Sequence, residues 1–431
     1  MTYDEAINYL TTSPKFGKIA GLQRIEKLLE LLGNPQKQLK FVHVAGTNGK
    51  GSVCACIHSV LIKAGYKTGL FISPHLQRFS ERARVDKTEI TEAQIAEYTN
   101  IISQKAEDMI QDGFEAPTEF EIITAMAMLH FNAASCDIVV LEVGIGGIID
   151  STNIIDESES LLSVITSIGF DHMDYLGETL PEIASKKAGI IKKNHTTIVY
   201  PAERAVMEVF ERACKENNAQ LIKLENSAVE IKSMRLSGTS FSLAPLSGLG
   251  DIQIKLLGKY GVYNAALAAL ACTELRNKGF DISDENILDG LAAAFWPGRL
   301  EIVSRSPLVI IDGAHNPEGA NALLSELSAY FAGYKLTFIC GCMADKDVDA
   351  LFALFANIAK RYITITPNSK RAMCGEKLAE KVKRFHNDVV FKGGIKEALD
   401  YAISTSAHDE VICAFGSLYF MGGVRDYFGL R

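Results

Sequence analysis

Long apolar runs, a basic excess and a secretion signal are all absent from this 431-residue sequence. No uninterrupted apolar stretch approaches the ~18 residues that suggest a membrane-spanning helix. The N-terminus, MTYDEAINYLTTSPKFG, has no basic segment followed by an apolar one, so we expect no signal peptide. The net charge is −8, which argues against a general binder of nucleic acids or membranes, since both usually need a basic surface.

A disulfide framework is also absent. The nine cysteines are scattered and mostly lie in apolar runs such as VCACIHSVL and LTFICGC. An odd count without a framework predicts reduced, buried thiols in a cytoplasmic protein. The pairs Cys54/Cys56 and Cys340/Cys342 could be read as metal ligands, but C-x-C alone is a weak signal and we favour packing in the core.

The composition itself is that of a soluble globular protein, with 48% apolar residues and mixed charges. The chain is too long for one ordinary core, so we expect two domains. Proline and glycine interrupt the pattern near FWPGRLEIVSRSP (295–307), and a fresh series of strands and helices begins there. The sequence therefore predicts an α/β protein with one domain over 1–297 and a smaller, Rossmann-like open α/β domain over 298–431.

Apolar periodicity locates the main elements. Helices are expected at 51–65, 91–110, 118–134 and 261–279, the second of them capped by Thr91. Residues 218–257 alternate between apolar and polar and are expected to form antiparallel strands. Almost continuous apolar, β-rich runs predict buried strands of a mainly parallel sheet at 39–45, 67–73, 136–144 and 161–169.

The stretch HVAGTNGKGSV (43–53) joins the first predicted strand to a helix. It deviates from the pattern G-x-x-x-x-G-K-[ST], because a glycine stands between Lys50 and Ser52. Its glycines let the backbone fold around an anion, Lys50 supplies positive charge, and the Ser52 hydroxyl can reach a magnesium ion. We interpret it as a phosphate-binding loop in an altered order; a plain turn between strand and helix is the alternative.

The order G-T-N-G-K-G-S resembles the loop of the Mur ligase superfamily, and in this form that of folylpolyglutamate synthases and dihydrofolate synthases. Those enzymes use ATP to join an amino acid to a carboxylate. The resemblance implies a P-loop-containing, Mur-ligase-like first domain. It also implies ATP contacts from the whole loop, namely Gly46, Thr47, Asn48, Gly49, Lys50, Gly51 and Ser52.

Three further segments resemble the metal-binding parts of this family. FISPHLQRFSER (71–82) resembles its S-P-H-L segment, LEVGIGGIIDSTN (141–153) its E-V-G-x-G-G-R-x-D-x-T-N, and residues 167–192 its D-H-x-x-x-L-G and I-A-x-E-K-A-G-I. The last matches a lysine that is carbamylated in the family, which makes it an oxygen donor. The resemblance implies two magnesium ions held by Ser52, Ser73, Glu142, His172 and Lys187.

Each of these residues has a plainer interpretation. A lone histidine is more often a packing residue or a helix cap, an unmodified Lys187 is an ordinary salt-bridge lysine, and S-P-H alone is a proline turn. Glu142 ends a buried strand, where a carboxylate needs a partner because burying it alone is costly.

The remaining nucleotide contacts are implied by segments in the second half of the chain. GKYGVYNAALAAL (258–270) resembles G-x-H-Q-x-x-N-A, in which Asn264 matches the residue that reads adenine. In WPGRLEIV, Arg299 matches an arginine on the ATP phosphates. In IIDGAHNPEG, Asp312 would bind the ribose and His315 would lie beside the nucleotide. Cell-wall ligases tend to have tyrosine where Gly313 stands.

The folate side is implied by shorter matches. APTEFEIITAMA (116–127) resembles the segment that holds the pterin ring, and IAGLQRI (19–25) is expected to contribute to the same pocket. Both stretches could equally be faces of amphipathic helices. The implied substrate contacts are Leu22, Arg82, Thr118, Phe120 and Asp150, and His75 also lies where a substrate-side contact is expected.

Several positions depart from the family pattern. Ile148 replaces an arginine, Lys186 replaces the glutamate before Lys187, and YG at 260–261 replaces histidine–glutamine. The segment ERARVD also drifts from E-R-I-x-x-N-G. Because Ile148 and this last segment lie near the folate side, the preferred folate form is left open.

Taken with the resemblance, the sequence predicts an ATP-dependent ligase that adds L-glutamate to dihydropteroate, to the γ-carboxylate of reduced folates, or to both. The resemblance implies an acyl phosphate intermediate and puts Lys50, Lys187 and His172 at the chemistry. Glutamate is expected on the C-terminal domain, with domain closure completing the site. We expect a cytoplasmic monomer whose partners are small molecules.

Two other functions are compatible with a phosphate loop. One is a Mur-type ligase with a non-folate acceptor, which Gly313 and the S-P-H-L segment oppose. The other is a nucleotide-binding switch or transport ATPase, which would not need Glu142, His172, Asn264 and Asp312 together.

Overall fold

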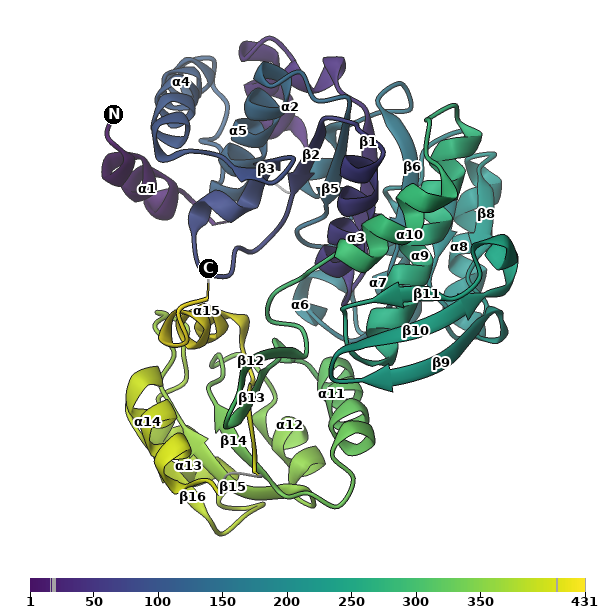
Figure 1. Ribbon diagram of the computed structural model, residues 1–431. Helices are drawn as coiled ribbons and strands as arrows, with labels where there is room; N and C mark the ends of the chain where they lie inside the picture. Colours follow the sequence, from purple (N-terminus) through teal and green to yellow (C-terminus); the bar gives the residue numbers. More distant parts are fainter. Residues whose placement is uncertain (16, 18–20, 408–409, 431) are drawn as a thin grey trace. The chain divides into compact units, whose positions relative to one another are not determined.

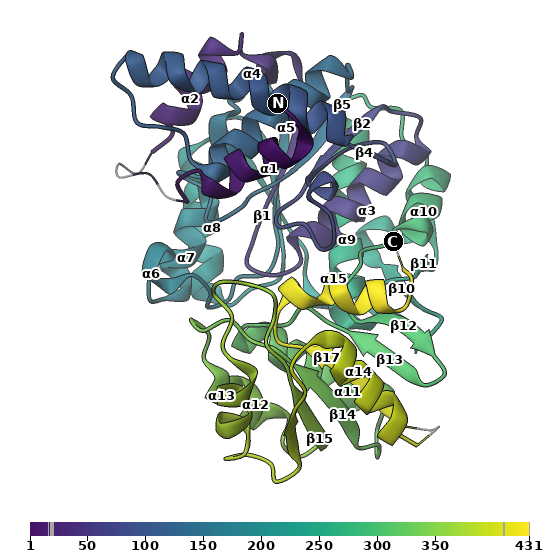
Figure 2. The ribbon, with the colours of Figure 1, turned by 90° about the vertical axis from the view of Figure 1, so that its left-hand side faces the viewer.

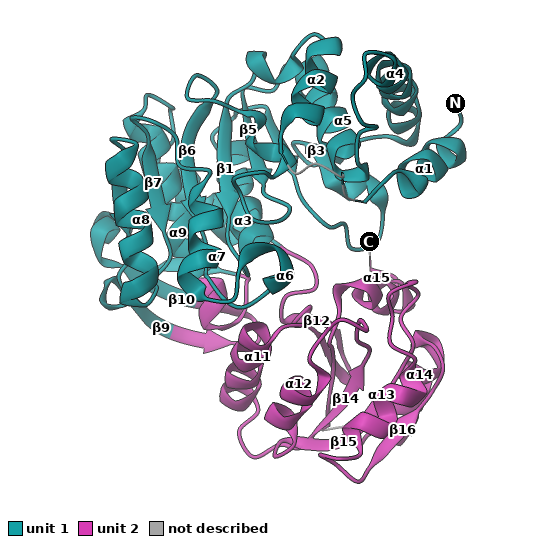
Figure 3. Cartoon of the chain, turned by 180° about the vertical axis from the view of Figure 1, so that it is seen from behind, with its two compact units in different colours: residues 1–232, 240–254, 263–295 teal, residues 233–239, 255–262, 296–431 magenta. Residues whose placement is uncertain are grey.

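The computed structural model describes residues 1–15, 17, 21–407 and 410–430. Two compact units are distinguished (Figure 3). The larger comprises residues 1–232, 240–254 and 263–295, and the smaller comprises residues 233–239, 255–262 and 296–431. The smaller unit therefore contains two short segments from before residue 296 and the whole chain from residue 296 onward.

The larger unit is built on an eight-stranded sheet with the order β4-β3-β2-β5-β1-β6-β7-β8 (Figure 1). Six strands run parallel, and the short β3 and β4 are antiparallel at one edge. The strands are β1 (Phe41–Ala45), β2 (Thr68–Phe71), β3 (Ala83–Val85), β4 (Thr88–Glu89), β5 (Ile138–Glu142), β6 (Ser160–Ile165), β7 (Thr196–Val199) and β8 (Gln220–Lys223).

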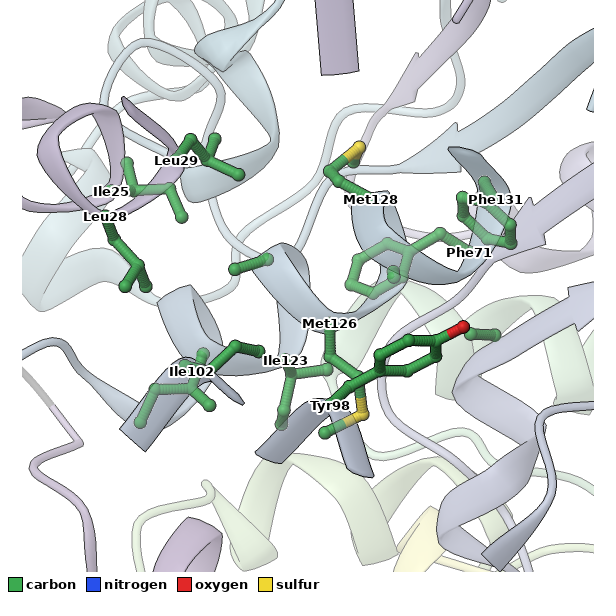
Figure 4. Packing of buried hydrophobic residues seen from close by; sticks show 14 of the residues in the cluster. Ile25, Leu28, Leu29, Phe71, Tyr98, Ile102, Ile123, Met126, Met128 and Phe131 are labelled. Atoms are coloured by element: carbon green, nitrogen blue, oxygen red, sulfur yellow. The ribbon is translucent and has the colours of Figure 1, made fainter. Parts of the chain in front are cut away.

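Both faces of this sheet are covered, which explains why its central strands read as continuous apolar runs. Alternate residues Phe41, Phe71 and Leu141 pack with α2 (Gln23–Leu31), α4 (Glu92–Gln111) and α5 (Glu119–Ala133); Figure 4 shows part of this cluster. The helix that follows the glycine loop, α3 (Lys50–Lys63), packs on β1, β2 and β5, and α10 (Asp284–Ala293) packs on α3. Near the other edge, α7 (Leu180–Ala188) and α8 (Arg204–Glu216) contribute to a cluster that includes Ala45, Ile165 and Val199.

Helix starts follow the local capping chemistry. Thr91 caps α4 and Thr118 caps α5, each as the first residue of a capping box closed by the side chain three positions on. The predicted cap at Thr91 is thereby confirmed. The N-terminal α1 (Tyr3–Thr12) begins in the same way at Thr2.

The expectation of antiparallel strands over 218–257 is only partly correct. A three-stranded sheet, in the order β11-β10-β9, contains β9 (Val229–Arg235), β10 (Gly238–Leu243) and β11 (Ile252–Ile254). A two-residue link makes β9 and β10 an antiparallel hairpin. The expectation is wrong for β8, which pairs parallel to β7 at the edge of the large sheet. Its alternation reflects an exposed edge position and not the strand direction.

The smaller unit contains a six-stranded sheet in the order β12-β13-β17-β14-β15-β16. All neighbours are parallel except β12, which is antiparallel to β13. The strands are β12 (Glu301–Arg305), β13 (Leu308–Ile311), β14 (Leu336–Cys340), β15 (Ala359–Thr364), β16 (Val389–Phe391) and β17 (Val411–Phe415).

Helices cover this second sheet on both faces (Figure 2). Phe338, Phe355 and Phe415 are in mutual ring contact, in a cluster with α11 (Pro317–Tyr330), α12 (Val348–Phe355) and α13 (Gly375–Val382). The intervening strand residues face α14 (Ile395–Thr405) and α15 (Leu418–Tyr427). The predicted α/β fold class, with a mainly parallel sheet and a second, smaller α/β sheet, is confirmed.

The cysteines are all free thiols, and only Cys374 is exposed. Cys54 and Cys56 lie inside α3, and Cys340 and Cys342 are fully buried, so both C-x-C pairs are core residues. Within the described parts of the chain, no helix has the length and apolar character required to cross a membrane.

Candidate active site

The glycine loop lies at the carboxyl end of β1, in the middle of the large sheet. In a parallel sheet the carboxyl ends of neighbouring strands meet at one edge, where ligands usually bind. The strands beside β1 are β5 and β6, and β2 lies beyond β5. The ends of these four strands and the segments after them therefore share one edge, which holds the loop, Ser73, Thr166 and Glu142, the last residue of β5.

Two glycines of the loop are required by its shape. Gly46 has φ 146°, and a Cβ there would lie 1.7 Å from Thr166 Oγ1. Gly49 has φ 88°, and a Cβ there would lie 2.6 Å from Asn264 Oδ1. Both contacts are far too short for any side chain. The predicted adenine residue Asn264, on α9 (Gly258–Asn277), is thus packed directly against the predicted phosphate loop.

The segment after β6 holds the loop from the other side. Thr47 N–H donates to the Ser167 carbonyl at 2.7 Å, and the Thr166 hydroxyl donates to the Asn48 carbonyl at 2.7 Å. The Thr47 hydroxyl also pairs with the backbone of Gly169. Sequence reasoning missed Thr166 and Ser167, although the predicted adjacency of parallel strands was a signal that could have pointed to them.

Two lysine ammonium groups meet at the loop. Lys50 Nζ donates to the carbonyls of Gly46 (3.2 Å) and Thr47 (3.1 Å). Lys187 Nζ, buried at the end of α7, donates to the same Gly46 carbonyl at 2.8 Å. Together with the start of α3 they concentrate positive charge beside a glycine cradle, which fits a polyphosphate ligand.

Three of the proposed magnesium ligands, Ser52, Ser73 and Glu142, are oxygen donors near this edge. Glu142 is 5% exposed, and its Oε2 accepts from the Ser73 N–H at 3.1 Å. Ser52 is buried in the first turn of α3. Hydroxyl and carboxylate oxygens suit magnesium, so these residues fit the ion that the sequence predicts.

His172 has a different setting. It is the residue before α6 (Met173–Leu176), with a left-handed backbone at φ 51° and an exposed side chain whose Nε2 lies 3.9 Å from Asp171 Oδ2. Over residues 1–15, 17, 21–407 and 410–430, no three histidine, cysteine or carboxylate side chains are grouped as a metal site. The donor set at the loop is therefore made of hydroxyls and Glu142.

Two predicted folate contacts converge at Gly144, just after β5. A Cβ on Gly144 would lie 2.6 Å from Phe120 Cζ and 3.1 Å from Asp150 Oδ2. Asp150 is 6% exposed and accepts from the N–H groups of Ile145 (2.8 Å) and Thr152 (3.0 Å). Burial raises the pKa of the Asp150 carboxyl despite these donors. The Phe120 ring and the Asp150 carboxylate thus pack against the bare backbone of Gly144, where any side chain would collide with them.

Thr118 and Leu22 occupy structural positions near this pair. The Thr118 hydroxyl accepts from the Glu121 N–H, and Glu121 in turn pairs with the buried Arg24 (3.0 Å). Leu22 and Phe120 pack against the same core cluster. Residues 19 and 20 of the predicted segment lie outside the described residues. Arg24, which anchors the start of α5, was missed by sequence reasoning because its partner lies 97 residues away.

Arg82, the last predicted substrate contact, is tied to the segment after β2. Its Nε donates to His75 Nδ1 at 2.9 Å, and its Nη1 lies 3.4 Å from Ser73 Oγ. Burial, and next the Arg82 charge, lower the pKa of His75 to about 4. His75 is therefore neutral at physiological pH, as an acceptor on Nδ1 must be.

In the smaller unit, Asp312 follows β13 and is 5% exposed. Its Oδ2 accepts from the Leu300 N–H (2.8 Å) and the Tyr260 hydroxyl (3.0 Å), and its Oδ1 accepts from the Ala314 N–H (2.8 Å). Burial raises the pKa of the Asp312 carboxyl, and the nearby Arg299 opposes that rise.

Gly313 lies against the Arg299 guanidinium. A Cβ on Gly313 would be 2.1 Å from Arg299 Nη1, so a tyrosine there would displace the arginine. His315 is held by its Nδ1, 2.8 Å from the Gly313 carbonyl. The three predicted nucleotide residues of this unit, Arg299, Asp312 and His315, thus surround one turn.

Two of the departures from the family pattern are neighbours in space. The Ile148 N–H donates to the Lys186 carbonyl at 3.0 Å, and the Ile148 side chain is 43% exposed. The loss of an arginine at one position and of a glutamate at the other therefore changes the charge of a single patch, beside the glycines that follow β5.

Comparisons with known proteins agree with this geometry. The profile "Mur ligase middle domain" matches residues 44–272, and the profile "Mur ligase, glutamate ligase domain" matches residues 298–418. The dihydrofolate synthase/folylpolyglutamate synthase of Bacillus subtilis is 34% identical over 427 residues, which cover 98% of either chain. The chain belongs to the folylpolyglutamate synthase family of Mur ligases.

Solved structures of the folylpolyglutamate synthase family share this fold. The Mycobacterium tuberculosis folylpolyglutamate synthase complexed with ADP superposes with a TM-score of 0.89 at 30% identity, covering 100% of this chain and 98% of that one. An FPGS–AMPPCP–folate complex gives 0.85 at 32% identity and covers 99% of each. The family predicted from the sequence is confirmed.

Proposed function

We propose that this member of the folylpolyglutamate synthase family is an ATP-dependent ligase that adds L-glutamate to dihydropteroate, to the γ-carboxylate of reduced folates, or to both, through an acyl phosphate. Relatives that span the whole chain are named for these two activities. The observation that carries the proposal is the glycine cradle, where Asn264, Lys50 and Lys187 gather on one loop beside the Phe120–Asp150 pair.

The nucleotide is assigned to the loop of residues 46–52 and to Asn264. Inward N–H groups and the Lys50 ammonium would neutralise phosphate charge, which is the main requirement of phosphoryl transfer. Asn264, fixed against Gly49, would read adenine. Arg299, Asp312 and His315 of the smaller unit would serve the phosphates and the ribose.

Magnesium is assigned to the oxygen donors of the same edge together with His172. When bound, it would neutralise the charge that develops on the transferred phosphoryl group. The proposed ligands are Ser52, Ser73, Glu142, His172 and Lys187, the last as a carbamate. The support for Lys187 as a ligand is its position, because its amine lies at the phosphate loop.

The folate ring is assigned to the neighbourhood of Phe120 and Asp150, which both pack against Gly144. Phe120 would stack on the pterin, and Asp150 would hydrogen-bond to its ring. Thr118 and Leu22 would shape the wall behind Phe120, and Arg82 would face the substrate from the segment after β2.

The two units suggest a division of labour. We assign the phosphate loop and pterin binding to residues 1–297, and glutamate binding, with the nucleotide contacts of Arg299, Asp312 and His315, to residues 298–431, in line with the profile that matches 298–418. We further propose a cytoplasmic monomer whose partners are its small-molecule substrates.

The test is ADP release by the purified protein with magnesium-ATP and glutamate, with dihydropteroate and tetrahydrofolate supplied separately and the products identified by mass. Glutamate added to both acceptors establishes both activities, and addition to tetrahydrofolate alone restricts the enzyme to chain extension. In that case Ile148→Arg, alone and with Lys186→Glu, tests whether the altered patch sets the preference. Equal ADP release with and without an acceptor refutes the proposal. The absence of ADP release with either folate also refutes it. Both results favour a non-folate Mur-type ligase or an ATPase.

A further inference from the structure

Tyr260 occupies a position where the family pattern has histidine. It lies in the first turn of α9, and it is partly buried against the core of the smaller unit. The backbone around it is held by α11: the Gly258 N–H donates to the Tyr330 hydroxyl at 3.1 Å, and the Lys259 N–H donates to Glu326 Oε1 at 2.6 Å. The position of the Tyr260 ring is therefore fixed independently of what its hydroxyl touches.

The hydroxyl donates to Asp312 Oδ2, an oxygen that also accepts from the Leu300 N–H. Two donors on one carboxylate oxygen use both of its lone pairs. The other oxygen, Oδ1, accepts from the Ala314 N–H alone among the described residues, and so retains one lone pair. The arrangement orients Asp312 and reserves a single acceptor site on Oδ1.

Asp312 in turn supports the turn that carries Arg299. Leu300 has a left-handed backbone at φ 42°, which is uncommon for a residue other than glycine and persists only where its surroundings enforce it. The enforcing contact is the bond from the Leu300 N–H to Asp312 Oδ2. Arg299 directly precedes Leu300, and its Nη1 lies against Gly313.

We infer that Tyr260 is a positioning residue for the nucleotide: its hydroxyl orients Asp312 so that Oδ1 accepts a hydrogen bond from a ribose hydroxyl. The inference rests on the proposed function, because that function assigns the ribose to Asp312. It predicts that this chain discriminates between sugars through a phenol where the family pattern has an imidazole.

The physical reason is orientation. A neutral phenol donates one hydrogen bond and adds no charge, so the charge of Asp312 remains available to the ligand. Without the phenol, Oδ2 keeps only the Leu300 N–H, and the carboxylate gains freedom to rotate away from the sugar. A hydrogen bond to a charged group contributes roughly tenfold or more to binding, which sets the expected size of the effect.

The experiment measures binding of ADP, 2′-deoxy-ADP and 3′-deoxy-ADP by calorimetry to the full chain and to Tyr260→Phe. The wild type is expected to prefer ADP to at least one deoxy analogue by about tenfold. In Tyr260→Phe the Kd of ADP should rise about tenfold while that of the disfavoured analogue changes little, so the preference should nearly vanish. In ligation assays the variant should raise the KM for ATP and leave kcat within about twofold, because the ribose is remote from the reacting atoms.

Matched controls separate orientation from folding. Tyr330→Phe removes the hydroxyl that holds the same turn of α9 without touching Asp312, and Tyr362→Phe removes a buried hydroxyl that has no hydrogen-bond partner among the described residues. Both should keep the sugar preference. Tyr260→His restores a donor and should recover at least half of the lost preference.

The outcomes are distinct. A sugar preference that survives in Tyr260→Phe, or that disappears equally in Tyr330→Phe, overturns the inference. A wild type that binds all three nucleotides equally overturns it as well. Failure of the wild type to ligate glutamate to any folate refutes the proposed function instead, and the binding series still decides the role of Tyr260.

Discussion

Replacing Gly46 with alanine tests the central feature of the site, the close approach of the loop to the segment after β6. The new Cβ would lie 1.7 Å from Thr166 Oγ1 and 2.9 Å from Thr166 Cβ, and the residue would have to keep φ 146°. The Thr166 hydroxyl would have to leave its position between the carbonyls of Ala45 (3.2 Å) and Asn48 (2.7 Å). The loop and the Thr166 side chain therefore cannot both retain their geometry.

The magnitude follows from two terms. Alanine in this backbone region costs ~1–3 kcal/mol of strain. The displaced hydroxyl loses a hydrogen bond that contributes ~0.5–1.5 kcal/mol. We expect Gly46→Ala to lower the free energy of unfolding by about 3 kcal/mol, which a protein of ordinary stability survives. Because a shift of ~1 Å in a positioning group costs about 100-fold, kcat/KM for ATP should fall by that factor.

Urea unfolding and steady-state kinetics with ATP measure the two effects, ADP titration measures the nucleotide affinity, and Gly65→Ala is the matched control. Gly65 also has positive φ, 85°, but a Cβ there meets no atom within 4 Å. The backbone strain in the control should lower the free energy of unfolding by only ~1 kcal/mol, and the control should bind ADP normally. The double variant Gly46→Ala/Thr166→Ala should regain part of the ADP affinity, since the shortest contact is gone. If Gly46→Ala lowers stability and activity no more than Gly65→Ala does, the contact of Thr166 with the loop has no role in shaping the loop.

Three further predictions concern charge. Lys50→Met should lower kcat for ligation about 10²–10³-fold with folding unchanged, as checked by steady-state kinetics and thermal unfolding; a smaller loss would show that Lys50 does not stabilise the transferred phosphoryl group. Arg24→Met leaves Glu121, which is 3% exposed, without its buried partner, and should lower the free energy of unfolding measured in urea by ~3 kcal/mol. The double variant Arg24→Met/Glu121→Gln should recover most of that loss. Additive effects of the two substitutions would contradict the pairing. Burial lowers the pKa of His130 to about 4, and neither ring nitrogen has a hydrogen-bond partner among the described residues. The unfolded chain therefore binds a proton near pH 6.5 that the folded chain refuses, and stability falls as pH drops from about 6.5 to 4. At pH 5, His130→Leu should remove a penalty of about 2 kcal/mol that is absent at pH 7.5, and an equal effect at both pH values would refute the assignment.

Local features of the site could be predicted from sequence because they depend on consecutive residues. The loop needs glycines at 46 and 49 for its backbone, a cation at Lys50 and a helix start, and all of these lie within a few positions. The continuous apolar runs before the loop and before Glu142 indicated strands buried on both faces, and the structure has them as β1 and β5. The fold class and the family followed from such local patterns.

Strand direction at the sheet edge was predicted less well. The alternation over 220–223 is compatible with either direction when one face of the strand is open to solvent. The crossover through α8 decides the matter, since it returns the chain parallel to β7.

The residues that hold the site in place were decided by tertiary structure alone. Thr166 reaches Asn48 across 118 positions, Arg24 reaches Glu121 across 97, and Tyr260 reaches Asp312 across 52. Periodicity and turn chemistry act over a few residues, so they specify which backbone can form but not which distant side chains will meet. Strand order and helix packing determine those meetings, and with them the orientation of the groups that the sequence had already identified.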